Sequence, residues 1–274
     1  MSVKVAVRVR PFNNREIELK GDNCVQMQGN TTTLRDPSTG NTRDFTFDYS
    51  FWSHDEFKTT EEGLYVATSD KYADQQKVFD CVGEEVLANA WSGYHCCLFA
   101  YGQTGSGKSY SMVGYGPNKG IVPISCEEIF KRVKSNNDVN KSFEIQFSML
   151  EIYNEKIQDL LVAINKRPQG GLKVREHKTH GVFVEDLSKH PVDSYEGIVH
   201  LTDVGNRNRT IGSTLMNACS SRAHTIITIE FKQIETLNGR KTEKLSIIYL
   251  VDLAGSEKLS KTGATGDRMK EGKN

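Results

Sequence analysis

The sequence has no excess of charge of either sign and no hydrophobic run long enough to cross a bilayer. Its 274 residues include 35 lysines and arginines and 35 aspartates and glutamates, so the formal net charge is zero. Whole-chain charge therefore gives no support to nucleic-acid binding, and an electrostatic partner has to be met by a local patch. A membrane helix needs about 20 consecutive apolar residues. The charged N-terminal segment MSVKVAVRVR is also unlike a secretory signal. We expect neither a nucleic acid nor a membrane as a direct partner.

Cysteine pairs with metal-binding spacing are absent as well. The six cysteines form no C-x-x-C pattern, and Cys96 and Cys97 lie inside an apolar run. This pattern indicates reduced, core-type thiols in a cytoplasmic protein and disfavours zinc sites and disulfides. The chain also lacks internal repeats, low-complexity segments and a linker rich in proline and serine. Because 37% of its residues are hydrophobic and 26% are charged, the sequence predicts one folded domain over residues 1–274.

The most informative stretch is an apolar run, 96–101, followed by a glycine-rich segment. The run has the length and bulk of a strand that is buried on both faces. The segment after it, Gly102-Gln103-Thr104-Gly105-Ser106-Gly107-Lys108-Ser109, matches the phosphate-loop pattern G-x-x-x-x-G-K-[ST]. Glycines let backbone N–H groups turn toward phosphate oxygens, Lys108 reaches the terminal phosphates, and the Ser109 hydroxyl is a ligand for Mg²⁺. The stretch therefore predicts a nucleoside triphosphate site.

Hydrophobic periodicity predicts strands and helices in alternation around this loop. Strands are expected over 4–10, 142–153, 225–235 and 244–253, and helices over 76–91, 121–133, 154–161 and 193–204, the last capped by Asp193. The polar residues 54–75 predict a long surface loop. Residues 172–174 and 182–184 predict a small hairpin. One α/β domain fits this order.

Two further segments carry the residue types that a nucleotide site needs. One apolar strand ends in Asp252-Leu253-Ala254-Gly255-Ser256-Glu257, where the acid is placed to hold a Mg²⁺-bound water and the Gly255 amide to reach a γ-phosphate. The loop Asn217-Ala218-Cys219-Ser220-Ser221-Arg222-Ala223-His224 has two adjacent hydroxyls and an arginine, which suit a mobile loop that closes on Mg²⁺ and phosphate. We expect His224 to be a structural residue at the start of a strand.

Four motifs, taken in order, resemble those of the kinesin motor domain. They are Arg8-x-Arg10-Pro11 on the first strand, FAYGQTGSGKS, the N-x-x-S-S-R-x-H loop and DLAGSE. The resemblance covers residues 3–274, and segments such as 47–52 and 173–177 are most similar to the third, vesicle-transporting kinesin class. It implies an α/β phosphate-loop NTPase fold with a central mixed β-sheet flanked by helices on both faces. It also implies a cytoplasmic, cytoskeleton-associated motor that hydrolyses ATP to ADP.

The resemblance assigns roles to the motif residues. The nucleotide would be bound by Arg8, Arg10, Pro11 and Tyr110 on the adenine side, by the loop from Gly102 to Ser109, and by Asn217. Mg²⁺ would be held by Ser109, by Ser221 and, through water, by Asp252. Residues with a catalytic role would be Lys108, Ser220, Ser221, Arg222, Gly255 and Glu257. Among these, Arg222 and Glu257 would form an ion pair that closes the pocket and orders the attacking water.

The partner that the resemblance implies is the microtubule. Residues 258–274 hold five lysines and arginines against Asp267 and Glu271, and a flexible basic loop suits an acidic surface. The hairpin 173–190 is the second implied contact. Ala223 stands where the family usually has serine, and we expect it to tune loop closure. The chain ends where kinesins begin their relay helix, which implies a C-terminally incomplete motor domain. A strand that the family places between the first strand and the phosphate-loop strand would then be missing.

Two functions remain open from the sequence, and a third is disfavoured. An ATPase motor domain is favoured by the presence of both Arg222 and Glu257. A nucleotide- and tubulin-binding module without productive hydrolysis or motility is favoured by the missing relay helix and neck linker. A GTPase switch is disfavoured because no N-K-x-D guanine signature follows. The residues do not specify an oligomeric state.

Overall fold

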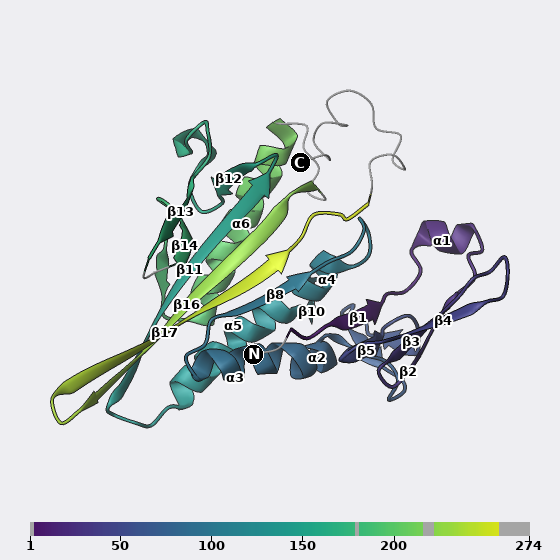
Figure 1. The fold of residues 1–274 in the computed structure, drawn as a ribbon, viewed down its shortest axis with the longest axis horizontal. Coiled ribbons are helices and arrows are strands. Elements are labelled where there is room, and N and C mark those ends of the chain that lie inside the picture. The colour runs from purple at the N-terminus through teal and green to yellow at the C-terminus, as the bar shows by residue number, and fades with distance from the viewer. Residues whose placement is uncertain (1–2, 179–180, 216–221, 258–274) are drawn as a thin grey trace. The chain divides into compact units, whose positions relative to one another are not determined.

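The computed structural model describes residues 3–178, 181–215 and 222–257, and its contacts divide the chain into two compact units (Figure 1). The first unit comprises residues 1–85 and 113–121, and the second comprises residues 86–112 and 122–274. The single domain expected over 1–274 stays a prediction. Within the described ranges, no helix has the length and apolar character needed to cross a membrane.

A six-stranded mixed sheet forms the centre of the second unit. Its strand order is β12–β11–β16–β17–β8, and β15 also pairs with β11. All these pairs are antiparallel except β17 and β8, which run parallel. The strands are β8 Cys96–Ala100, β11 Lys141–Tyr153, β12 Lys156–Asp159, β15 His190–Val192, β16 His224–Leu237 and β17 Arg240–Asp252. The core on this sheet includes the fully buried side chains of Phe147, Ile229, Phe231 and Ile248.

Helices and a small hairpin complete the second unit. Two helices, α3 Glu84–Trp91 and α5 Ile121–Ser135, begin at the unit boundary. The other elements are α4 Lys108–Met112, a 3-10 turn Ile164–Lys166, the hairpin β13 Val174–His177 and β14 Gly181–Val184, and α6 Tyr195–Leu215. The predicted hairpin is thus confirmed. Helix α6 is capped by Ser194, whose hydroxyl accepts from the Gly197 amide at 3.2 Å, so the predicted cap at Asp193 is wrong by one residue.

The first unit is built from short strands. Strand β1 Ala6–Val9 runs parallel to β5 Tyr49–Trp52, and β2 Val25–Gln28, β3 Thr31–Arg35 and β4 Thr42–Thr46 form an antiparallel sheet. The remaining elements are α1 Asn14–Glu18, β6 Phe57–Thr59, β7 Tyr65–Ala67, α2 Gln75–Val78, β9 Gly114–Tyr115 and β10 Asn118–Lys119. A π-helical turn, Phe79–Gly83, continues α2 toward α3 and keeps the chain helical over the predicted range.

Two segments differ from the predicted secondary structure. Residues 54–75 are not one loop, because β6 and β7 pair there as an antiparallel hairpin. Residues 154–161 are not a helix, because Asn154 and Glu155 have φ of 48° and 59° and turn the chain so that β12 pairs with the end of β11. Asparagine tolerates this left-handed conformation, and in so short a segment the turn signal outweighs apparent helical spacing.

Strand β8 is not buried on both faces as predicted. Phe99 is 59% exposed, and Cys97 is exposed too. Among the described residues, β17 is the single strand that pairs with β8, so β8 lies at the edge of the sheet. An apolar run reports side-chain character but not which neighbours cover each face, and this is why the prediction failed. The interpretation of the cysteines as core residues holds for Cys96 and Cys126, which are buried, but not for the exposed Cys97.

Candidate functional site

The phosphate loop and the segment 253–257 leave the sheet together from the ends of β8 and β17. The two strands are parallel, and Asp252 is level with Ala100 in their register. The Leu253 amide donates to the Ala100 carbonyl at 3.3 Å, and the Ser256 amide donates to the Gly102 carbonyl at 3.0 Å. In α/β sheets, ligands bind outside the carboxyl ends of parallel strands. The register therefore brings two predicted motifs to one location.

The phosphate loop has the backbone conformation for which its glycines are needed. Gly102 has φ of 154°, and a Cβ there would lie 2.5 Å from the Ser106 hydroxyl oxygen. Lys108 is the first residue of α4, and its Nζ donates to the carbonyls of Gly102 and Gln103, both at 3.0 Å. The ammonium group therefore lies within the loop itself, where it supplies positive charge for an anion.

Ser109 and Asp252 form a pair of oxygen ligands next to the loop. Ser109 Oγ donates to Asp252 Oδ2 at 2.5 Å. The second carboxylate oxygen, Oδ1, is buried and has no hydrogen-bond partner in the described part of the chain. A buried carboxylate oxygen without a donor is costly unless a cation satisfies it, and Mg²⁺ prefers hydroxyl and carboxylate oxygens. These two residues therefore fit a magnesium ion. The third predicted ligand, Ser221, lies outside the described residues.

Glu257 contacts the phosphate loop directly. Its carboxylate accepts from the Thr104 amide at 2.8 Å and also from the Thr104 hydroxyl. These hydrogen bonds, chiefly the one from the hydroxyl, hold the pKa of Glu257 below its usual value, so the group is ionised at neutral pH. No sequence pattern predicts this contact, because the two residues are 153 positions apart and no spacing rule relates them.

The start of β16 is tied to the same segment. His224 Nδ1 accepts from the Ala254 amide at 3.0 Å, which confirms the structural role expected for His224. Arg222 and the buried Ala223 precede this strand. The ion pair between Arg222 and Glu257 stays a prediction. Asn217, Ser220, Ser221 and the basic segment 258–274 lie outside the described residues.

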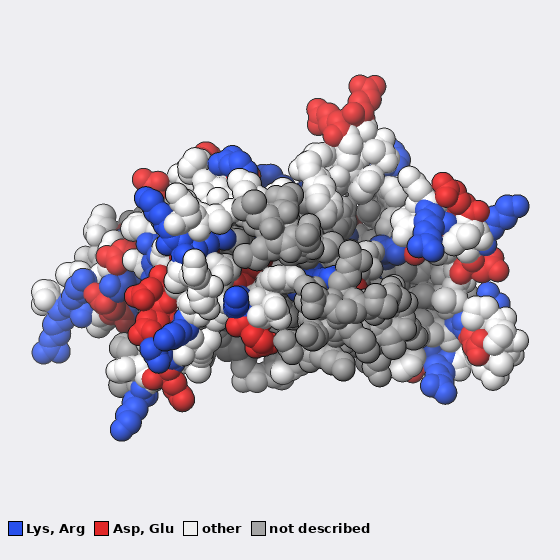
Figure 2. All heavy atoms as spheres, turned by 90° about the horizontal axis from the view of Figure 1, so that it is seen from above, with Lys and Arg blue, Asp and Glu red and all other residues white. Residues whose placement is uncertain are grey.

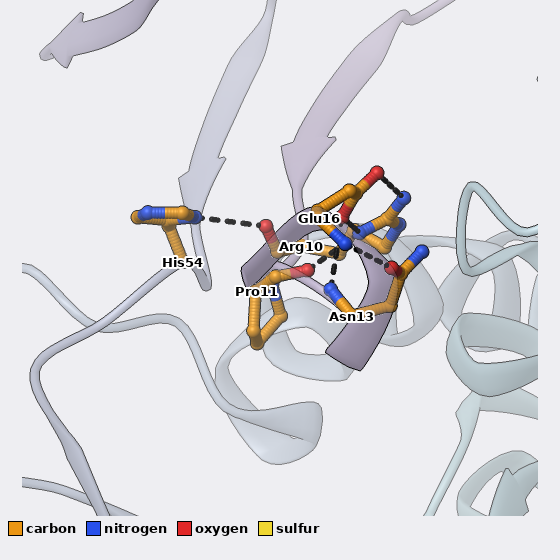
Figure 3. A network of polar contacts seen from close by, with 5 residues as sticks. All are labelled: Arg10, Pro11, Asn13, Glu16 and His54. Atoms are coloured by element: carbon orange, nitrogen blue, oxygen red, sulfur yellow. Dashed lines mark hydrogen bonds and ion pairs between the residues drawn. The ribbon is translucent and has the colours of Figure 1, made fainter. Parts of the chain in front are cut away.

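In the first unit, Arg10 is held by a bidentate ion pair with Glu16 (Figure 3). Both nitrogen–oxygen distances are 2.7 Å, and Arg10 also donates to the Pro11 carbonyl at 2.6 Å. Glu16 accepts from the Asn13 amide and Asn13 Oδ1 accepts from the Glu16 amide, both at 2.9 Å, which forms the capping box of α1. The Arg10 guanidinium lowers the pKa of Glu16 to about 2. The His54 ring points toward the Arg10 carbonyl, with Nδ1 at 3.1 Å (Figure 3).

Arg8, also in the first unit, is oriented by three neighbours. Its Nε donates to the Ser53 hydroxyl at 2.9 Å, and its Nη1 donates to Gln75 Oε1 at 2.7 Å. Its Nη2 donates to the Ala73 carbonyl at 3.3 Å. Sequence reasoning singled out Arg8 but missed these partners, since they belong to no motif. Tyr110 lies in α4 of the second unit, so the predicted base-side group of Arg8, Pro11 and Tyr110 stays a prediction.

Comparison with known proteins decides the family. A family model described as the kinesin motor domain matches residues 8–274. This chain belongs to the kinesin motor domain family. The human kinesin-like protein KIF1C is 48% identical over 279 residues, covering 100% of this chain and 24% of that protein. Kinesin-related protein 1 of Dictyostelium discoideum is 47% identical over 290 residues, covering 100% of this chain and 13% of that protein.

Solved kinesin structures agree with the fold. A KIF14 dimer with AMP-PNP, in complex with a microtubule, has a TM-score of 0.86 and 40% identity, covering 99% of this chain and 73% of that chain. The predicted kinesin-type α/β fold is thus confirmed, and the predicted class fits relatives such as KIF1C and KIF13A. This kinesin motor domain spans between 13% and 24% of the length of the curated relatives that it matches.

Proposed function

We propose that this kinesin motor domain binds and hydrolyses Mg-ATP and couples the reaction to microtubule binding. The observation that carries the proposal is the meeting of two motifs, the phosphate loop and the segment 252–257, at the ends of β8 and β17. There Lys108 donates to the Gly102 carbonyl of the phosphate loop, Ser109 donates to Asp252, and Glu257 accepts from Thr104. Solved relatives contain ADP or AMP-PNP in complex with a microtubule, which supports the same ligands here.

Different residues of the second unit would contact the phosphates and the Mg²⁺ ion. Lys108 would hold the β- and γ-phosphates, and the Gly255 amide would meet the γ-phosphate. Mg²⁺ would be held by Ser109, Ser221 and, through water, Asp252, and when bound it neutralises charge on the phosphate oxygens. Positioning and charge stabilisation would lower the barrier, because phosphoryl transfer leaves little covalent chemistry for the protein.

Glu257 would position the attacking water and help to relay its proton. Its lowered pKa keeps the carboxylate ionised and able to accept a hydrogen bond. To pair with Arg222 as proposed, the carboxylate would exchange at least part of its contact with Thr104. Such an exchange is a movement of the kind by which nucleotide switches close. Asn217 and Ser220 would act in the same closing loop, and Arg8, Arg10, Pro11 and Tyr110 would bind the base.

The microtubule would be contacted by the basic segment 258–274 and by the hairpin 173–190. In the described part of this hairpin, Arg175 pairs with Glu185 at 2.9 Å, and Val182 and Phe183 are exposed. With this partner, the protein would be located in the cytoplasm, on the cytoskeleton.

The first experiment measures steady-state ATP hydrolysis by the 274-residue chain with and without polymerised microtubules. Strong stimulation by microtubules is expected. A flat, low rate with retained nucleotide binding would instead support the module that binds nucleotide and tubulin without productive hydrolysis.

A substitution at Glu257 tests the assignment of the catalytic residue. We expect Glu257→Ala to bind ATP but to lose most turnover, by roughly 10²-fold or more, because the water loses its positioning carboxylate. The matched control is Glu18→Ala, since Glu18 is an exposed carboxylate at the end of α1. Unchanged turnover in Glu257→Ala would remove Glu257 from the mechanism.

A further inference from the structure

Asn118 joins two hairpins of the first unit. Asn118 is the first residue of β10 and is 6% exposed. Its Oδ1 accepts from the Tyr65 amide at 2.9 Å, and its Nδ2 donates to the Gly63 carbonyl at 2.8 Å. Both partners belong to the β6–β7 hairpin. One buried side chain therefore satisfies two backbone groups of a segment that the sequence predicted to be a loop.

Gln75 continues this network toward Arg8. Gln75 is the first residue of α2, which is capped by Asp74, and it is 8% exposed. Its Nε2 donates to the Asn118 carbonyl at 3.3 Å, while its Oε1 accepts from Arg8 Nη1 at 2.7 Å. The donor and the acceptor of the amide have different partners. A flipped amide would therefore place its NH₂ group against Arg8 Nη1 and its oxygen against the Asn118 carbonyl. The Asn118 carbonyl thus selects the amide orientation that binds Arg8.

The turn 113–120 is shaped to present that carbonyl. Gly114 has φ of 80°, and a Cβ there would lie 2.0 Å from the Asn118 carbonyl oxygen. A side chain at this position would displace the carbonyl that Gln75 needs. Ser53, 3% exposed, fixes the other side of the guanidinium, because its hydroxyl accepts from Arg8 Nε and donates to the Ala73 carbonyl at 2.5 Å.

We propose that Gln75 is a positioning residue for nucleotide binding, held in its working orientation by Asn118. It acts by fixing the Arg8 guanidinium on the base side of the nucleotide, and Asn118 of β10, which bonds to the β6–β7 hairpin, holds Gln75 in turn. This inference rests on the proposed function, in which Arg8 binds the base. It adds two residues, neither of them in a nucleotide-binding motif, whose contribution is made through Arg8 and not through the phosphates.

The test compares Gln75→Leu with Gln75→Glu in the 274-residue chain, using a fluorescent ADP analogue and inorganic pyrophosphate as competing probes. Gln75→Leu removes the acceptor for Arg8, and we expect the Kd for ADP to rise about tenfold, the usual effect of losing a hydrogen bond to a charged group. Gln75→Glu keeps an acceptor for Arg8 but places an oxygen against the Asn118 carbonyl, so it should recover only part of the ADP affinity that Gln75→Leu loses. Pyrophosphate has no base, so its affinity should be the same in both variants.

Asn118 is tested by hydrogen exchange together with binding. Asn118→Ala should speed exchange at the Tyr65 amide and weaken ADP binding while leaving pyrophosphate binding unchanged. Asn41→Ala is the matched control, since Asn41 is an exposed asparagine in the β3–β4 turn of the same unit.

The outcomes separate this inference from the proposed function. If the unsubstituted chain binds neither ADP nor pyrophosphate, the proposed function fails. If it binds both and Gln75→Leu leaves ADP affinity unchanged, or weakens both probes equally, the positioning role is wrong. A purely structural role for Gln75 predicts that Gln75→Leu weakens both probes equally, because a general loss of structure affects the binding of ADP and of pyrophosphate alike.

Discussion

At the scale of single residues, the two arginines of the first strand are fixed by different chemistry. Arg8 donates to neutral acceptors, the Ser53 hydroxyl, the Gln75 amide and the Ala73 carbonyl. Arg10 instead pairs with the ionised carboxylate of Glu16. The second arrangement depends on pH in the acid range, because the Glu16 carboxylate titrates there.

The Arg10–Glu16 pair predicts how the stability of the protein responds to acid. The pKa of Glu16 is lowered from 4.5 to about 2 in the folded chain, first by the hydrogen bond from Arg10. A lowered pKa stabilises the fold above pH 4.5, and that contribution is lost as the pH falls toward 2. We expect Glu16→Gln to reduce the free energy of unfolding at pH 7 by about 1 kcal/mol, since the pair is partly exposed and also caps α1.

Urea unfolding at several pH values measures this effect. The difference between the unsubstituted chain and Glu16→Gln should shrink as the pH is lowered from 5 toward 2. Glu18→Gln, which alters an exposed glutamate at the end of the same helix, is the control. A difference that grew on acidification would contradict the ion pair.

At the scale of elements, helix α6 lies close to strand β11 at a glycine. A Cβ on Gly205 would lie 2.3 Å from the Met149 sulfur, and Met149 is only 2% exposed. On the same helix, a Cβ on Gly197 would meet its nearest atom at 3.5 Å, an ordinary contact. The two glycines therefore serve different purposes, and only Gly205 is required by packing.

Alanine substitutions on α6 test this difference. Gly197→Ala should leave stability unchanged or raise it by up to about 1 kcal/mol, because alanine is the better helix former. Gly205→Ala forces the buried Met149 to move and should be less stable than Gly197→Ala by about 1–3 kcal/mol. Thermal unfolding of both variants gives the comparison, and equal melting temperatures would show that Met149 moves at no cost.

The elements also show where sequence reasoning succeeds. The alternation of 225–235 and the apolar run within 244–253 predict two strands, and β16 and β17 confirm them. The turn between these strands contains Asn238 and Gly239, both with positive φ. The β6–β7 hairpin was not predicted, and Asn118, whose side chain bonds to it, lies 53 residues from Tyr65. For the site, motifs identified Lys108, Ser109 and Asp252. The Thr104–Glu257 and Gln75–Arg8 contacts join distant positions with no spacing rule, and only the fold reveals them.

At the scale of the whole molecule, balanced charge shapes the expected interaction with a microtubule. The chain has a formal net charge of zero, and on the face shown in Figure 2 lysine and arginine side chains lie beside acidic ones. Long-range attraction to an acidic filament therefore has to come from local groups. The proposed group is the segment 258–274, whose sequence has five basic and two acidic residues.

Ionic strength tests this local contact. Co-sedimentation with microtubules should weaken as salt is raised from about 25 to 150 mM, since the Debye length falls below about 10 Å over this range. Replacing Lys258 and Lys261 by alanine should weaken binding at low salt and flatten the salt dependence. The same double change at Lys20 and Lys58, exposed lysines of the first unit, serves as the control. If microtubule binding changed neither with salt concentration nor on replacement of Lys258 and Lys261, an electrostatic contact at this segment would be ruled out.

The pairing of β8 with β17 also sets an order of events during protein synthesis. Ser109 and Asp252, which bond to each other, are 143 residues apart in the chain. At a synthesis rate of 5–20 residues per second, Asp252 is made roughly 7–29 s after Ser109. During that interval the nascent chain carries a phosphate loop without its acidic partner. A nucleotide that needs both groups could therefore stabilise the nascent chain only after Asp252 has been made.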